Sequence, residues 1–192
     1  MKYISILFCI FFISSCSTHM TKLAYEGQGY SSSKFKPLIN TIIVSDERGT
    51  DKNWLGAIRG GYGNRLKTLR TEESTDSVVK KMYEDALNKS KLLSTSIDSP
   101  YAIKVVITKY DCSYYMNREA HAHVNISLID NSTSTIRFSK SYKTDEVETG
   151  VGAGIFGSVD TLRALAETAM NNTIDKALSD EEFINALTSS IQ

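Results

Sequence analysis

Apolar and polar residues alternate along three stretches in the middle of the chain, as in strands with one buried side and one solvent-facing side. Residues 101–110 and 120–128 show this two-residue period, and residues 136–142 resume it after a turn-like polar sequence at residues 130–134. The short polar separation predicts that the second and third stretches form an antiparallel hairpin, preceded by a further strand at 101–110.

Two other apolar patterns predict a central strand and a hairpin. Residues 38–44 are mostly apolar and β-branched, which is typical of a strand covered on both faces. Two short apolar pieces, 54–58 and 66–69, flank a polar, glycine-rich sequence at residues 59–64. We expect these two pieces to form an exposed hairpin.

Apolar residues recur at helical spacing in two stretches, one that begins near residue 75 and one near the C-terminus. The first predicted helix starts at Thr75 or Asp76, and a short final helix follows the capping-box pair Ser179 and Glu182. The apolar side of the first helix holds Val78, Val79, Met82, Tyr83, Ala86 and Leu87, and that of a long helix near the C-terminus holds Leu162, Leu165, Ala166, Ala169, Met170, Ile174, Ala177 and Leu178.

The order of these elements predicts an α+β fold. We expect an antiparallel or mixed β-sheet of about 4 to 6 strands, with two main helices packed on one face. The other face would be partly open to solvent or to a partner. The length of 192 residues predicts a single domain, at residues 38–192, once an N-terminal export segment is set aside.

The N-terminus has the pattern of a bacterial lipoprotein signal. Lys2 is followed by an almost unbroken apolar run of ten residues from Ile4 to Ile13, which is too short to cross a bilayer because a spanning helix needs roughly 20. Ile13, two serines and Cys16 then resemble the lipobox, in which the cysteine is lipidated and becomes the new N-terminus. We therefore expect a signal peptide at 1–15 and a covalent lipid on Cys16, with no other cofactor.

A polar segment separates this lipidation site from the predicted domain. Residues 16–37 are rich in serine, threonine, glycine and lysine, so we expect a flexible tether with a reach of roughly 25 Å. Ser17, by analogy with other lipoproteins, points to the periplasmic face of the outer membrane.

The three cysteines provide a check on this interpretation. Cys9 would leave with the signal and Cys16 would carry lipid, so Cys112 would have no partner for an intramolecular disulfide. If Cys16 is not lipidated, it could pair with Cys112 instead.

Charge is balanced overall and asymmetric in one place. The chain has 22 lysines and arginines against 22 acidic residues, which argues against a general nucleic-acid binder. Between residues 48 and 70, however, basic residues outnumber the single acid, Asp51. Either this segment is a solvated loop, or it contacts lipid headgroups, peptidoglycan or an acidic protein surface. The candidate contact residues are Arg48, Arg59, Arg65, Lys67 and Arg70, with Trp54 and Tyr62.

Two motifs resemble sites of chemistry but lack parts that such sites need. Residues 152–157 match G-x-G-x-x-G, but a dinucleotide site also needs a second parallel strand and an acidic residue beyond the helix, so a nucleotide-binding enzyme is a distant alternative. His121 and His123 share one strand face and could present two imidazoles to a metal, but no third ligand stands at an obvious offset. We therefore predict no metal site, no catalytic residues and no enzyme activity.

The lipobox, the polar segment, the turn at Asp46, Glu47 and Arg48, and the C-terminal sequence 180–184 together resemble the YajG-type family of bacterial lipoproteins. The order of elements is also similar to that of small envelope domains such as the N-terminal domain of TolB. These resemblances imply a non-catalytic accessory module that binds an envelope protein assembly. The alternative is a module that contacts lipid or peptidoglycan through the basic hairpin 48–70.

Overall fold

A computed structural model describes residues 17–30, 37–149 and 158–189. Seven strands form one mixed sheet, in the order β1-β4-β3-β5-β6-β7, with β2 also paired to β5. The strands are β1 (Ser17–Thr21), β2 (Ile39–Asp46), β3 (Trp54–Arg59), β4 (Arg65–Thr71), β5 (Tyr101–Tyr114), β6 (Arg118–Asp130) and β7 (Ile136–Glu148).

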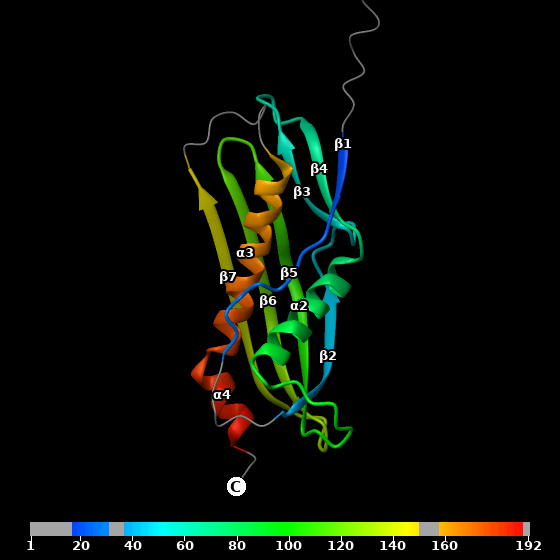
Figure 1. The fold of residues 1–192 in the computed structure, drawn as a ribbon, viewed down its shortest axis with the longest axis vertical. Helices are drawn as coiled ribbons and strands as arrows, with labels where there is room; N and C mark the ends of the chain where they lie inside the picture. Colours follow the sequence, from blue (N-terminus) through cyan, green and yellow to red (C-terminus); the bar gives the residue numbers. More distant parts are fainter. Residues whose placement is uncertain (1–16, 31–36, 150–157, 190–192) are drawn as a thin grey trace, which may run out of the picture.

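Strand β5 organises the sheet because it is long enough to pair with two strands along the same side. Residues 101–107 pair with β2, and residues 112–114 pair with β3, both in parallel. Its other side pairs along its whole length with β6, which in turn forms the predicted antiparallel hairpin with β7. Figure 1 shows β2 and β3 following one another along β5.

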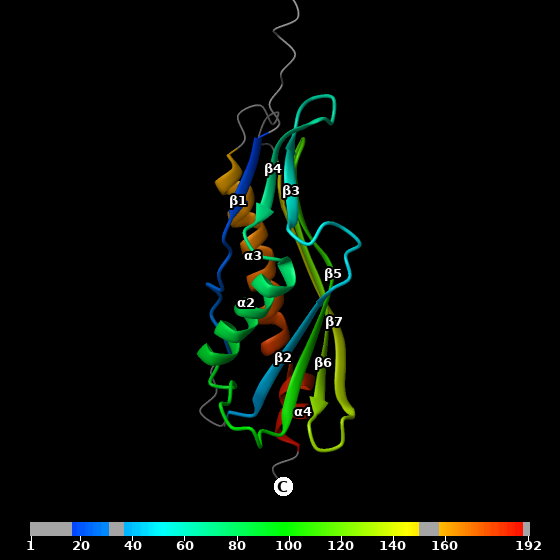
Figure 2. The same ribbon diagram turned by 90° about the vertical axis from the view of Figure 1, so that its right-hand side faces the viewer.

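Three helices cover one face of this sheet, so the predicted α+β class and the one-sided arrangement are confirmed. They are α2 (Thr75–Lys89), α3 (Val159–Leu178) and α4 (Glu181–Thr188). Figure 2, viewed from the side, shows the helices in one layer and the sheet in the other. The apolar residues expected on the inner sides of α2 and α3 are buried. No described helix is long and apolar enough to cross a membrane.

The helix boundaries differ slightly from those predicted. The N-cap of α2 is Ser74, and the N-cap of α4 is Asp180, whose carboxylate accepts a hydrogen bond from the Glu182 amide. A carboxylate at this position suits the positive end of the helix dipole, which is why Asp180 replaces the expected Ser179.

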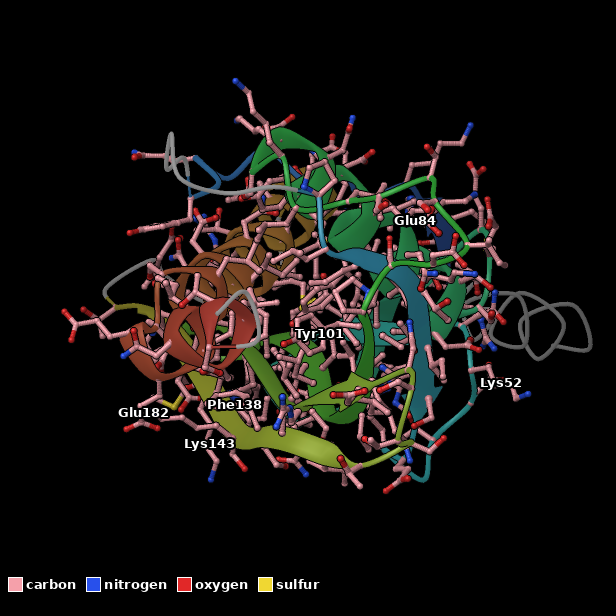
Figure 3. All side chains as sticks on the ribbon, turned by 90° about the horizontal axis from the view of Figure 1, so that it is seen from below. Lys52, Glu84, Tyr101, Phe138, Lys143 and Glu182 are labelled. Carbon is pink, nitrogen blue, oxygen red and sulfur yellow. The ribbon has the colours of Figure 1, made fainter. Side chains whose placement is uncertain are left out.

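The core lies between the helices and the inner face of the sheet. Tyr101 is fully buried there, and Phe138 of β7 packs edge to face against Phe183 of α4, with ring centroids 5.6 Å apart. Figure 3 looks along the long axis and shows Tyr101 in the interior, whereas Lys143 and Glu182 point outward.

The predicted flexible tether over residues 16–37 is wrong for residues 17–30. Residues 17–21 are strand β1, which pairs in parallel with β4, and the next residues lie against α3. The Ala24 amide donates to Glu167 at 3.2 Å, the Tyr25 hydroxyl donates to Asp175, and the Gln28 amide donates to the same carboxylate at 3.0 Å. Polar composition was misleading here because a strand on the sheet edge needs backbone pairing more than apolar side chains.

Strand β1 also explains why the sheet has seven strands, one more than the upper end of the expected range. The glycine motif at residues 152–157 lies outside the described residues. In the described part of the chain no strand follows α3, so the second parallel strand of a dinucleotide-binding unit is missing there.

Candidate functional site

The basic segment 48–70 does not form one continuous contact surface, because its residues have different roles. The side chain of Arg48 is only 4% exposed and cannot serve as the surface contact that the sequence suggested. Its guanidinium forms two hydrogen bonds to the Asp46 carboxylate, at 2.8 and 2.7 Å. It also donates to the main-chain oxygens of Trp54 and Tyr110, at 2.8 and 2.6 Å.

The Asp46–Arg48 pair therefore joins the end of β2 and the start of β3 to the middle of β5. Burial opposes ionisation of Asp46, but the hydrogen bonds and charge of Arg48 outweigh this effect and hold the pKa of the carboxyl below its ordinary value. The turn at residues 46–48 is thus a structural joint. Its role is to connect the two strands that share one side of β5.

The remaining basic residues lie on the predicted hairpin, which β3 and β4 form in antiparallel pairing. Arg70 is paired with Asp51 at 2.5 Å, near the base of the hairpin. The Arg65 guanidinium lies over the Trp54 ring, 4.5 Å from its centroid, as in a cation–π pair. Arg59 donates to the Gly63 carbonyl at 3.1 Å and so closes the turn.

The hairpin is exposed only at its tip, since the described strand β3 is also paired with β5 and its residues Leu55, Ala57 and Ile58 are buried. Tyr62 in the turn is fully exposed, and Met116 in the neighbouring β5–β6 turn is 73% exposed. These two turns touch, because the Tyr115 hydroxyl donates to the Gly61 carbonyl at 3.0 Å.

Strand β1 starts at the same end of the molecule. Ser17 lies opposite Lys67 in the parallel pairing of β1 with β4, two residues after β4 leaves the hairpin turn. Figure 1 shows the start of β1, the β3–β4 turn and the β5–β6 turn together at the top. We call this group, residues 17, 60–67 and 115–117, the hairpin end.

A different group of candidate residues lies on the sheet face that the helices leave uncovered. His121 and His123 project from β6, and Asp145 lies opposite His121 in the pairing of β6 with β7. Oδ1 of Asp145 is 2.5 Å from Nδ1 of His121 and 2.8 Å from Nε2 of His123. The carboxylate therefore bridges the two imidazoles.

The hydrogen bonds from His121 and His123 lower the pKa of Asp145 to about 2, so the carboxylate is ionised at neutral pH. The expectation that no acidic residue accompanies the two histidines is therefore wrong. A signal was present in the sequence, because a hairpin centred on the predicted turn near Thr133 brings Asp145 opposite His121.

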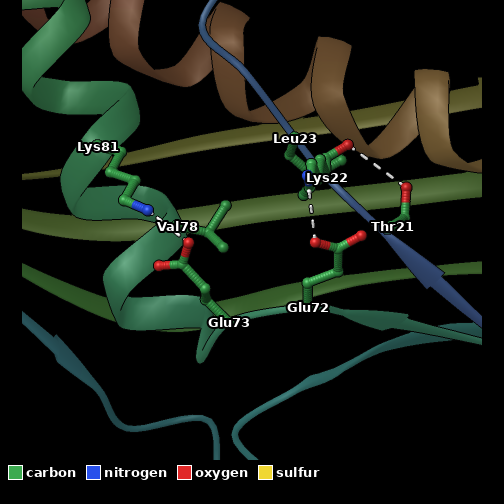
Figure 4. Close-up of a pocket in the computed structure, with 7 residues that line it drawn as sticks. All are labelled: Thr21, Lys22, Leu23, Glu72, Glu73, Val78 and Lys81. Atoms are coloured by element: carbon green, nitrogen blue, oxygen red, sulfur yellow. Dashed lines mark hydrogen bonds and ion pairs between the residues drawn. The ribbon is translucent and has the colours of Figure 1, made fainter.

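A pocket beside the end of β1 is lined by charged residues that are paired with one another. Figure 4 shows the residues that line it, which include four charged side chains: Lys22 just after β1, Glu72 and Glu73 between β4 and α2, and Lys81 on α2. Lys22 is paired with Glu72 at 3.4 Å, and Lys81 is paired with Glu73. The first pair links the residue after β1 to the β4–α2 connection, and the second links that connection to α2, so the pocket is lined by surface ion pairs.

Comparisons with known proteins show a shared fold without shared sequence. No protein-family model matches the chain, and no curated protein matches it. A solved structure from Xanthomonas campestris, described as a DUF330 protein, matches with a TM-score of 0.65 and 12% identity, covering 91% of this chain and 100% of that one. A second structure, described only as an uncharacterized protein, matches with a TM-score of 0.50 and 6% identity, covering 83% and 94%. At these identities the likeness shows the fold alone.

Proposed function

We propose that this chain is a lipid-anchored, non-catalytic binding module of the bacterial envelope. In this proposal the lipid on Cys16 holds the hairpin end against the membrane. The uncovered sheet face then points away from the helices toward an envelope protein partner. The lipobox supports the anchor, and the resemblance to YajG-type lipoproteins supports the accessory role.

The observation that carries the proposal is the pairing of Ser17 with Lys67. Ser17, the first residue of β1, follows Cys16 directly in the chain, and consecutive Cα atoms are only 3.8 Å apart. A lipidated Cys16 would thus bring the hairpin end close to the headgroups, because residues 17–21 are part of the sheet and cannot act as a spacer.

The exposed groups at the hairpin end suit a membrane surface. Tyr62 and Met116 provide exposed apolar area, and tyrosine is a residue that favours the interface between headgroups and acyl chains. Arg59, Arg65 and Lys67 add positive charge within the same segment, which favours anionic headgroups. This combination favours lipid contact over a solvated loop.

The proposal also needs a surface for a protein partner, and the sheet provides one. Strand β7 ends the sheet on one side, and in the described residues only β6 pairs with it. Its outer edge could accept a further strand from a partner. The uncovered face beside this edge is polar: Asn125 is hydrogen-bonded to Ser141, and Ser127 is hydrogen-bonded to Ser139.

The proposal can be tested with photocrosslinking amino acids placed in the full chain in living cells. A crosslinker at position 62 should capture phospholipid, and one at position 141 should capture the same envelope protein in repeated experiments. A crosslinker at position 85, on the exposed side of α2, is the matched control and should capture neither. Variant C16S should lose incorporated palmitate and lipid capture together. Palmitate incorporation without lipid capture from position 62 would rule out the proposed orientation.

A further inference from the structure

The cluster of His121, His123 and Asp145 has the composition and spacing of a metal site. The two histidines are two residues apart on β6, so both side chains lie on the same side of the sheet. Asp145 comes from the neighbouring strand β7, directly opposite His121. Two paired strands thus deliver three ligand-type side chains to one point.

The donor atoms already face a common position. One ligand atom from each residue lies within 4.8 Å of the other two. Tetrahedral zinc, with bonds of about 2.0 to 2.2 Å to nitrogen and oxygen, separates its ligand atoms by roughly 3.3 Å. Small side-chain rotations of the half-exposed Asp145 would therefore suffice to admit an ion between the three groups.

The surroundings of His121 can support its metal-binding form. Glu119 Oε2 is 4.0 Å from Nε2 of His121, on the side of the ring away from Asp145. When Nδ1 binds an ion in place of its hydrogen bond to Asp145, the proton of the neutral ring sits on Nε2, where the Glu119 carboxylate would stabilise it. Asp111 lies opposite His121 on β5 and adds a further negative charge, whereas Lys109 and Lys143 lie beside His123.

We propose that His121, His123 and Asp145 bind one divalent transition-metal ion of the zinc class. Nδ1 of His121, Nε2 of His123 and a carboxylate oxygen of Asp145 would be the ligands. Imidazole and carboxylate donors suit Zn²⁺, Co²⁺, Ni²⁺ and Cu²⁺ rather than Ca²⁺ or Mg²⁺. Three protein ligands leave at least one coordination position for water or for a side chain of a partner.

This proposal is independent of the lipid anchor, because the site is built entirely from β6 and β7. Binding requires neutral imidazoles, so any protons on Nδ1 of His121 and Nε2 of His123 pass to solvent as the ion binds. The site is exposed on the uncovered sheet face, the same surface that we propose for a protein partner. An ion there could link two proteins through its open coordination position.

The test uses the mature chain with C16S, produced without an affinity tag that contains histidine. Cobalt titration followed by visible absorption should show a single site with nitrogen and oxygen ligands, and Zn²⁺ should displace Co²⁺ at a one-to-one ratio. Variants H121Q, H123Q and D145N should each lower Zn²⁺ affinity by more than about 10-fold. Thermal melting without metal should show that these variants remain folded.

The chain contains a matched control, since its one histidine outside the cluster is His19 on β1. Variant H19Q removes one imidazole without touching the cluster and should bind Zn²⁺ as tightly as the parent protein. Affinity weaker than about 1 mM would overturn the proposal. Binding that survives in D145N and disappears in H19Q would overturn it as well.

Discussion

Ser17 lies opposite Lys67 in the parallel pairing of β1 with β4, so the sheet begins one residue after the predicted lipidation site. This pairing gives the anchor a direction. A domain on a long flexible tether could rotate freely above a membrane, whereas a domain anchored at its own sheet edge cannot.

Lengthening the anchor should separate the hairpin end from the membrane. An insertion of about 20 glycine and serine residues between Cys16 and Ser17 would give a reach of roughly 25 Å. Lipid capture from a crosslinker at position 62 should then fall strongly. The same insertion in the β6–β7 turn, after Ser132, serves as the control and should leave lipid capture unchanged. Equal lipid capture from the two insertion variants would contradict the proposed membrane contact.

Replacement of Arg48 by methionine should strongly destabilise the fold. The change removes the guanidinium that neutralises the nearly buried Asp46 carboxylate and leaves it the hydrogen bond from the main-chain amide of residue 48; loss of a buried charge partner typically costs about 3 to 5 kcal/mol. The control is R70M, because Arg70 is paired with a half-exposed Asp51 and such surface pairs contribute little to stability. Urea unfolding measures the loss in the free energy of unfolding for each variant. Similar losses in the two variants would show that the Asp46–Arg48 pair is not a structural joint.

The same pair should also control part of the pH dependence of stability. The pKa of Asp46 is lower in the folded protein than the ordinary value of 3.8, so its contribution is present above that value and is lost as pH falls toward the folded pKa. In R48M the Asp46 carboxylate loses the charge and the hydrogen bonds of the guanidinium, so burial should raise its pKa and acid should relieve part of the cost. The difference in the free energy of unfolding between the parent protein and R48M should therefore become smaller as the pH falls from about 5 to about 3. A difference that stays constant over this pH range would argue against a role of the Asp46–Arg48 pair in the pH dependence of stability.

Replacement of Gly56 by alanine should disturb the junction of β3 with β5. A Cβ atom at this position would lie 2.0 Å from the main-chain oxygen of Cys112, and backbone cannot move aside cheaply. We expect a loss of more than about 2 kcal/mol in the free energy of unfolding. Gly61 in the hairpin turn is a suitable control, since a Cβ there meets no atom within 4 Å and G61A should be nearly neutral.

Cys112 should be unreactive in the folded protein. Its side chain is buried beside Gly56, and burial raises the pKa of the thiol far above its ordinary value, so little thiolate forms. An aromatic disulfide reagent should label it only after urea unfolds the chain. A disulfide between Cys112 and Cys16 in protein isolated from cells would contradict both this prediction and the lipid anchor.

Several elements could be predicted because their signals are local. The inward sides of α2 and α3 follow from helical spacing, and the β6–β7 hairpin follows from two alternating runs and a polar turn. Arg48 was assigned to the surface because a charged residue in a polar turn is usually solvated. Its burial depends on hydrogen bonds to Asp46 and to main-chain oxygens, one of which belongs to Tyr110, 62 residues away on β5.

The sequence by itself determined the α+β class, the one-sided packing of the helices and the candidate lipid site at Cys16, since each depends on residue type and spacing within a short segment. Tertiary structure alone decided that residues 17–21 join β4 and that β2 and β3 share one side of β5. It also brought Asp145 to the two histidines. The physical reason is that strand pairing is a contact between distant segments, whose register depends on the whole core rather than on either segment.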